Sequence, residues 1–147
     1  QLLSDYSSLT TVISSEFRST QARSDMVNTR LTLPQKKKWF YMVRSGEKPE
    51  EYREITPYWC NRFLDVDASR IVYINEETLE FMVNESIFKL RQFLRVTFTL
   101  GYPKAGDMER RMTFNNPKIR IGTGRPEWGA EEGKKYFVIT WDKTKEI

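Results

Sequence analysis

The sequence predicts an α+β protein with six or seven short, mostly antiparallel strands and two or three helices. Residues 93–100 and 135–141 alternate in polarity or in bulk with the period of two that is typical of a β-strand. Trp39, Met42 and Val43 recur at the spacing that places side chains on one face of a helix. Strand patterns and helix patterns therefore occur in the same short chain.

The length, composition and net charge of the chain limit the number of domains, the cellular location and the kind of partner that we expect. The 147 residues, 39% hydrophobic and 30% charged, suit one domain with one core. No apolar run approaches the roughly 18 residues of a membrane span, and the first residues lack the pattern of a signal peptide, so we expect an intracellular, cytoplasmic protein without a membrane partner. The net charge of +4 indicates an anionic partner without requiring one.

Two scarce residue types exclude whole classes of chemistry. The chain has no histidine, which excludes serine-histidine triads, histidine-ligated zinc and the usual general base near neutral pH. Its single cysteine, Cys60, cannot form an intramolecular disulfide or a thiolate cage, and its aromatic neighbours favour a buried apolar role. We expect no metal and no cofactor. Any catalysis would use carboxylates, lysine, tyrosine or hydroxyls.

The first 30 residues differ in composition from the rest. Eleven of them are Ser or Thr, their acids and bases cancel, and the only helical spacing is short. We expect residues 1–30 to be a weakly structured extension or a single helix, with the domain spanning residues 31–147.

The stretch that organises the domain runs from residue 31 to residue 59. A short strand at 31–33 is expected to stop at Pro34, and the helix that carries Trp39 should end at Gly46, which can adopt a left-handed conformation. The following residues, 50–55, are extended but carry charges on both faces. One interpretation is a charged edge strand that resists aggregation.

The other interpretation is a polar site at the end of the helix. Lys48, Glu51 and Arg53 would then converge in a cleft, where they could hold a phosphate, a base edge or a scissile amide. Pro57 is expected to begin a second helix, in which Tyr58 suits a solvent-facing position and Trp59 suits the core.

Gly46, Lys48, Glu51 and Arg53, in the order G-x-K-x-x-E-x-R after an amphipathic helix, resemble the signature of the ASCH domain family. Further similarity to small bacterial and phage-borne ASCH proteins extends over most of residues 31–141. The resemblance implies a PUA-like fold, a mixed and mostly antiparallel β-barrel, and a function in RNA binding. Some relatives resemble amidohydrolases of acetylated cytidine, and others resemble ribonucleases. In the amidohydrolases a lysine and a threonine of the motif belong to the catalytic group, and the corresponding positions here are Lys48 and Glu51.

The second half of the chain supplies more strands and more cations. Residues 71–74 are predicted to form a buried strand. The spacing of apolar residues in 76–90 fits a helix, but polar residues interrupt it. Residues 93–100 are predicted to form a strand with Leu94, Val96, Phe98 and Leu100 facing inward. Two short strands around Asn115, Asn116 and Pro117 predict a hairpin. Its cations include Arg111, Lys118 and Arg120, which suggest either a solvated face or a stripe that follows phosphates.

The glycine-rich stretch 122–129 resembles a dinucleotide fingerprint but lacks its glycine spacing and its βαβ unit, so we expect a structured loop. Trp128 should cap the cleft beside Tyr58 or fill the barrel interior. The last strand, 135–141, is expected to close the barrel against the first.

The favoured function is a nucleic-acid-binding module, with RNA or a nucleotide-like ligand as partner. Its expected binding residues are Lys48, Glu51, Arg53, Tyr58, Arg111, Lys118, Arg120 and Trp128. One alternative is a hydrolase of RNA or of a modified nucleoside, in which Lys48 and Glu51 form an acid-base pair. Another is a protein or small-ligand interaction domain.

Overall fold

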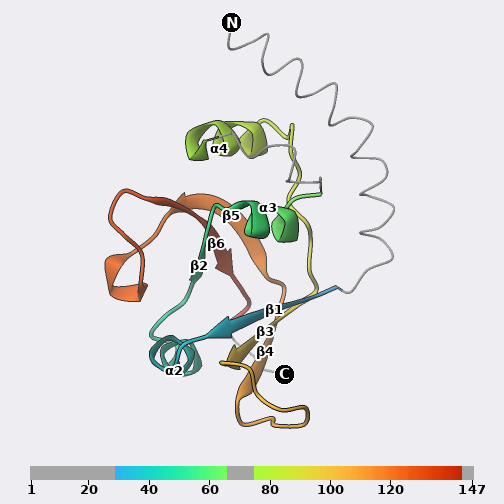
Figure 1. Ribbon diagram of the computed structural model, residues 1–147, viewed down its shortest axis with the longest axis vertical. Helices are drawn as coiled ribbons and strands as arrows, with labels where there is room; N and C mark the ends of the chain where they lie inside the picture. Colours follow the sequence, from blue (N-terminus) through green and yellow to red (C-terminus); the bar gives the residue numbers. More distant parts are fainter. Residues whose placement is uncertain (1–28, 66–74, 144–147) are drawn as a thin grey trace, which may run out of the picture. The chain divides into compact units, whose positions relative to one another are not determined.

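The computed structural model describes residues 29–65 and 75–143 (Figure 1). The expected N-terminal extension and the expected strand at 71–74 lie outside these residues. Within them the protein has three α-helices and six mostly antiparallel strands, which confirms the α+β class. None of the described helices is long and apolar enough to cross a membrane.

The described residues form two compact units. The β unit contains residues 29–53 and 92–143, and the helical unit contains residues 54–65 and 75–91. The elements of the β unit are β1 (Arg30–Gln35), α2 (Lys37–Ser45), β2 (Glu51–Glu54), β3 (Arg95–Leu100), β4 (Arg111–Asn115), β5 (Lys118–Thr123), the 3-10 turn η2 (Pro126–Trp128) and β6 (Lys135–Thr140).

The strands of the β unit form two three-stranded sheets, with the orders β1-β3-β4 and β2-β6-β5. β1 runs parallel to β3, while β3 with β4 and β5 with β6 are antiparallel. The prediction that the last strand pairs with the first is wrong, because β6 lies between β2 and β5. In the described part of the chain the two sheets are not joined into one closed barrel.

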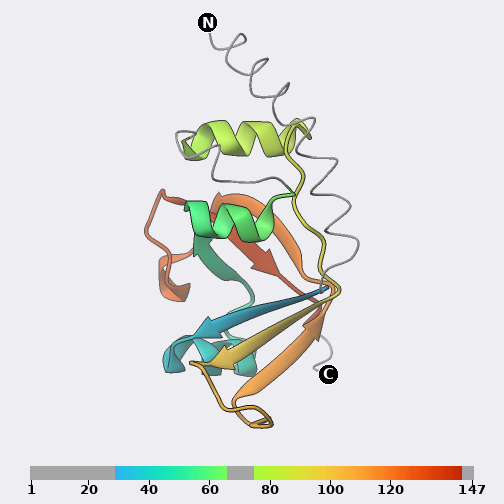
Figure 2. The same cartoon turned by 45° about the vertical axis from the view of Figure 1, so that its right-hand side comes forward.

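The predicted hairpin around Asn116 is also wrong. β4 pairs with β3, whereas β5 pairs with β6, so the two strands belong to different sheets. Asn116 has a φ of 55°, in the left-handed region, and its N–H donates to the carbonyl of Leu94 at 3.0 Å. This turn, followed by Pro117, carries the chain out of the first sheet and into the second, as the bend between the two orange strands shows (Figure 2).

The burial of β3 differs from its alternating pattern. Val96 and Phe98 are buried as expected, but Leu94 is 63% exposed, and Thr97 and Thr99 are buried. The hydroxyls need not face water because the Thr97 and Thr113 hydroxyl oxygens are 2.9 Å apart, while Thr99 donates to the carbonyl of Gly101 at 2.7 Å. Because four consecutive residues, 96–99, are buried, β3 is covered on both faces.

Pro34 does not end the first strand as predicted but lies inside β1. β1 is an edge strand of its sheet, and at an edge a residue that lacks an N–H removes no hydrogen bond from the ladder. Leu31 and Leu33 of β1 are fully buried, while Arg30 before them and Thr32 between them are exposed. Phe98, Phe114 and Trp141 pack with edge-to-face and tilted rings in the same unit.

The helical unit contains α3 (Pro57–Phe63) and α4 (Glu76–Asn84). Pro57 begins α3 as predicted, and the Thr56 hydroxyl caps the helix by accepting the N–H of Trp59 at 3.2 Å. Trp59 stacks on Phe63 with ring centroids 5.3 Å apart, and Tyr58 is 63% exposed. Cys60 is buried, and its burial raises the pKa of the thiol to about 11.

Candidate nucleic-acid interface

The candidate site begins where β1 passes into α2. Gly46 ends α2 with a φ of 85°, and its N–H donates to the carbonyl of Val43. The N–H of Lys48 then donates to the carbonyl of Met42 at 2.9 Å, which turns the chain back along the helix. This reversal is the local reason that residues 48–53 come to lie beside the end of β1.

A buried ion pair forms the base of the site. Lys48 is only 1% exposed, and its Nζ donates to Glu51 Oε1 and to the carbonyl of Glu50, both at 2.9 Å. The same ammonium lies 5.7 Å from the ring centre of Trp39 and 5.2 Å from that of Tyr52. Burial lowers the pKa of Lys48, and the neighbouring Glu51 carboxylate opposes this effect.

The Glu51 carboxylate is 5% exposed and has several donors around it. Oε1 accepts from Lys48 and from the N–H of Tyr52 at 2.9 Å, and it lies 3.3 Å from Arg53 Nη1. Oε2 accepts from Gln35 Nε2. Both oxygens are therefore engaged within the protein, which makes Glu51 an anchor that holds the surrounding donors in place.

Arg53 is held in a defined orientation beside this pair. Its guanidinium donates to the carbonyl of Pro34 at 2.8 Å and to that of Tyr52 at 3.0 Å, and its side chain is 15% exposed. A guanidinium fixed in this way presents its plane and its charge to a ligand with little further loss of conformational freedom.

Glu51 and Arg53 border a pocket of about 270 Å³ in the β unit. Its lining consists of Pro34, Gln35, Lys36, Trp39, Glu51, Tyr52, Arg53, Trp128 and Gly129. Gly129 has a φ of 101°, and a Cβ at this position would lie 3.1 Å from Trp39 Cζ2, so only glycine fits against that indole without displacement. Two tryptophans and a guanidinium thus share one small concave site.

Tyr52 fixes the loop that carries Trp128. Its hydroxyl donates to Glu50 Oε1 at 2.7 Å and accepts the N–H of Arg125 at 3.0 Å. Burial raises the pKa of this phenol. Trp128 packs against the buried cluster that Tyr52 forms with Ala130, Tyr136 and Val138, and the Arg125 guanidinium lies 5.0 Å from its ring centre. The loop predicted from the glycine spacing is therefore an ordered wall of the pocket.

The structure brings Lys48, Glu51 and Arg53 together, but not all three face the pocket. Glu51, Arg53 and Trp128 line the pocket, whereas Lys48 does not and is enclosed behind Glu51. The Lys48 ammonium contacts the Glu51 carboxylate and the Glu50 carbonyl and not the pocket.

The cations of the predicted hairpin do not form a stripe, because β4 and β5 belong to different sheets. The Arg111 guanidinium donates to the carbonyls of Pro103, Lys104 and Asp107 and so braces the loop before β4. Arg120 pairs with Glu50 at 3.3 Å, and Lys118 is an exposed residue at the start of β5. Tyr58 belongs to the helical unit and lies outside the site described here.

Several pocket residues were not identified from the sequence. The sequence places Trp39 on the apolar face of its helix without a binding role, and Gln35 and Lys36 carry no recognisable pattern. The weak signal that was available is their position: they immediately follow Pro34 and precede the helix that leads into the motif. Gln35 is 6% exposed, and its Oε1 has no hydrogen-bond partner within the described residues. Gln35 thus contributes one buried, unsatisfied acceptor.

Comparison with known proteins found no similar protein. No family model matches the chain, no curated protein matches it, and no solved structure matches it. The described residues contain no group of three Asp, Glu, Cys or His side chains placed to hold a metal ion.

Proposed function

We propose that the protein binds single-stranded nucleic acid, with RNA as the favoured partner, and that one unpaired base enters the pocket of the β unit. The observation that carries the proposal is the combination of Trp39, Trp128 and an immobilised Arg53 around about 270 Å³ of space. Aromatic rings and guanidinium planes are the groups on which unpaired bases stack, and each such contact tolerates any base.

Each pocket residue has a role in this proposal. Trp128 offers a ring face to a base, and Arg53 offers charge and hydrogen-bond donors to a phosphate or a base edge. Lys48 and Glu51 hold these groups in place from behind.

The ASCH resemblance and the PUA-like barrel belong to the same proposal. The motif residues Gly46, Lys48, Glu51 and Arg53 act together in the structure: the glycine ends α2, and the three charged residues form one network. A motif whose members share one site supports a functional interpretation over a charged edge strand. A cytoplasmic location, where RNA is abundant, fits this function.

A hydrolase is the second candidate, and one observation favours it. Burial lowers the pKa of Lys48, and a buried lysine beside a carboxylate is a recognised feature of acid-base sites. Two other observations weigh against it: Lys48 does not line the pocket, and both Glu51 oxygens accept hydrogen bonds from the protein. Proton transfer would therefore require this network to open.

The test is a binding measurement across a salt series. Wild-type protein and Arg53→Ala would be titrated into a labelled single-stranded RNA of mixed sequence. Binding should weaken steeply with salt, and Arg53→Ala should lower the affinity about tenfold and reduce the logarithmic salt slope by about 0.7, the value for one phosphate contact on a single strand. Arg53→Lys, which retains the charge but not the planar fork, is the control for charge alone.

The same wild-type samples, incubated for hours with the RNA or with N-acetylated cytidine and assayed for product, distinguish the candidates. Binding without product supports the module. Wild-type product that disappears in Lys48→Met, while that variant still binds RNA, would favour the hydrolase. Absence of both binding and product would leave the protein or small-ligand domain.

A further inference from the structure

The exposed side of α2 and the loop that follows β3 form a surface beside the pocket, here termed the α2 surface. It comprises the exposed residues Lys36, Lys37, Lys38, Tyr41 and Arg44 of the α2 segment, with Tyr102, Lys104 and Met108 of the loop 101–110. Lys36 also lines the pocket, so the surface begins at the pocket rim. We infer that the α2 surface is the track along which a single strand continues after one of its bases has entered the pocket.

The distribution of charge on α2 is the first argument. Three lysines stand at the start of the helix, where the helix dipole is positive and where acids would stabilise it. α2 contains no acidic residue at all. Lys36 and Lys37 form no ion pair within the described residues, and Lys38 contacts only the ring of Trp39, at 4.7 Å. These cations therefore oppose helix stability and remain available to an anion.

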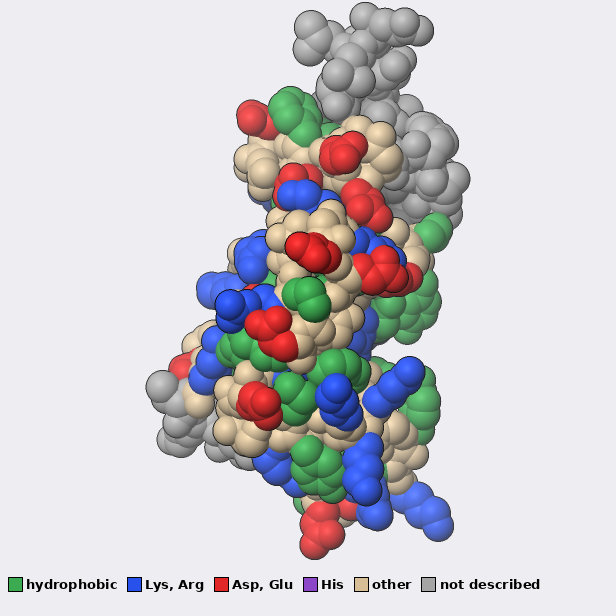
Figure 3. Space-filling view, turned by 90° about the vertical axis from the view of Figure 1, so that its left-hand side faces the viewer, with side chains coloured by type: hydrophobic (Ala, Val, Ile, Leu, Met, Phe, Trp, Pro, Cys, Tyr) green, Lys and Arg blue, Asp and Glu red, His purple; other side chains and the backbone are tan. Residues whose placement is uncertain are grey.

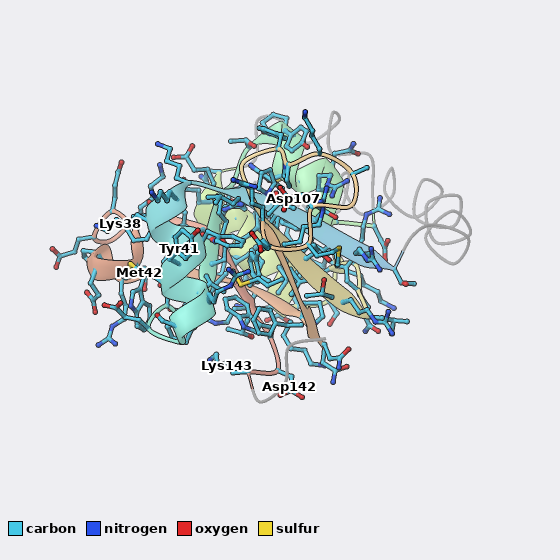
Figure 4. All side chains as sticks on the ribbon, turned by 90° about the horizontal axis from the view of Figure 1, so that it is seen from below. Lys38, Tyr41, Met42, Asp107, Asp142 and Lys143 are labelled. Carbon is cyan, nitrogen blue, oxygen red and sulfur yellow. The ribbon has the colours of Figure 1, made fainter. Side chains whose placement is uncertain are left out.

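The helical spacing is the second argument. Lys37, Tyr41 and Arg44 follow one another at i, i+4 and i+7, so they lie along one exposed side of α2. Figure 4 shows Lys38 and Tyr41 labelled on the helix, with Asp107 in the loop beside it. The helix spans about 12 Å, from nine residues with a rise of about 1.5 Å each. A row of cations broken by a tyrosine is suited to alternating phosphates and bases.

The loop 101–110 extends this row. Arg44 Nη2 donates to the carbonyl of Glu109 at 2.9 Å, which fastens the end of α2 to the loop. Tyr102 is 91% exposed and Met108 is 72% exposed, so their side chains are accessible to a base that follows the strand. The acids of this loop are Asp107 and Glu109, and Asp107 is paired with Arg110 at 2.6 Å. Blue side chains gather at the lower end of the face in Figure 3, at the height of α2 and this loop.

The register of β1 and β3 supplies a matched control surface. Gln35, which leads into α2, pairs with Leu100 at one end of these strands, and Arg30 pairs with Arg95 at the other. Arg95 and Lys143 are exposed and lie near Asn115 at that other end, since Arg95 pairs with Asn115 and the N–H of Asp142 donates to the Asn115 carbonyl. Replacing these two cations changes the net charge equally but leaves the α2 surface intact.

The experiment compares Lys37→Gln/Lys38→Gln with Arg95→Gln/Lys143→Gln, using a short labelled single-stranded RNA and, separately, adenosine monophosphate as probes. The α2 variant should bind the RNA about tenfold more weakly, with a salt slope reduced by about 1.4, while its binding of the mononucleotide stays unchanged. The control variant should match wild type with both probes. Lys37→Gln alone should give about half of the change in slope, which separates the charge from the contact of Lys38 with Trp39.

The inference rests on the proposed function, and the outcomes separate the two. RNA binding that Arg53→Ala weakens but the α2 variant does not would overturn the track and leave the pocket standing. Equal losses with RNA and mononucleotide would also overturn it, because the lysines would then act at the pocket. Absence of RNA binding by wild type would refute both. Capture by phosphatidylserine vesicles in place of RNA would assign the surface to a membrane and overturn the inference.

Discussion

Glu51→Gln is expected to lower the free energy of unfolding by about 3–5 kcal/mol, the range measured when one partner of a buried ion pair is removed. Lys48 is 1% exposed, and after this change its ammonium would face the Glu50 carbonyl and a neutral amide instead of a carboxylate. Arg53, 3.3 Å from the same carboxylate, would lose this ion pair too. Chemical denaturation followed by tryptophan fluorescence measures the change.

The double variant Lys48→Met/Glu51→Gln should recover part of this loss, since it removes the uncompensated ammonium together with its partner. A double loss equal to the sum of the single losses would show that the pair is not coupled and would contradict the geometry. Asp107→Asn is the matched control, because Asp107 also pairs with an arginine but at the surface. Its effect should be much smaller than that of Glu51→Gln.

Trp128→Ala is expected to weaken RNA binding by about 5- to 150-fold, which corresponds to the 1–3 kcal/mol of one base–aromatic stack. Trp128 lines the pocket, and its loop is held by the hydrogen bond between Tyr52 and Arg125. Fluorescence anisotropy with the labelled single-stranded RNA gives the affinity.

Trp128→Phe should retain most of the binding, because a smaller ring still offers a stacking face. Leu94→Ala removes an exposed apolar side chain next to Arg95, at the far end of β3, and should bind as wild type does. Since Trp128 also packs on a buried cluster, the thermal midpoint of each variant must be recorded. If a folded Trp128→Ala protein bound RNA as tightly as wild type, Trp128 would not be part of the binding site.

The local elements could be predicted because their signals lie close together in the sequence. Gly46 ends α2 and Pro57 begins α3 through backbone constraints that belong to those residues alone. The convergence of Glu51 and Arg53 followed from their spacing of two along an extended segment. These features need no knowledge of the rest of the chain.

The pairing of strands could not be predicted in the same way. Whether β4 turns back on β5 or passes into another sheet depends on partners distant in sequence, namely β3 for one and β6 for the other. The pattern around Asn116 and Pro117 is compatible with both. The predicted stripe of cations depended on that hairpin and is therefore wrong as well. The pocket residues Gln35, Lys36 and Trp39 lie beside Glu51 only because of the path of β1, which their own sequence pattern does not indicate.

The central claim is that a base of single-stranded RNA enters the pocket between Trp39 and Trp128. The most direct measurement is the shift of the indole N–H resonances of the four tryptophans during titration with a single-stranded RNA, each assigned from its Trp→Phe variant. Trp141, 7% exposed and packed against Phe98 and Phe114, is the internal reference. The account predicts saturable shifts of Trp39 and Trp128 with Trp141 unmoved; saturable RNA binding that leaves both pocket indoles unmoved would contradict it.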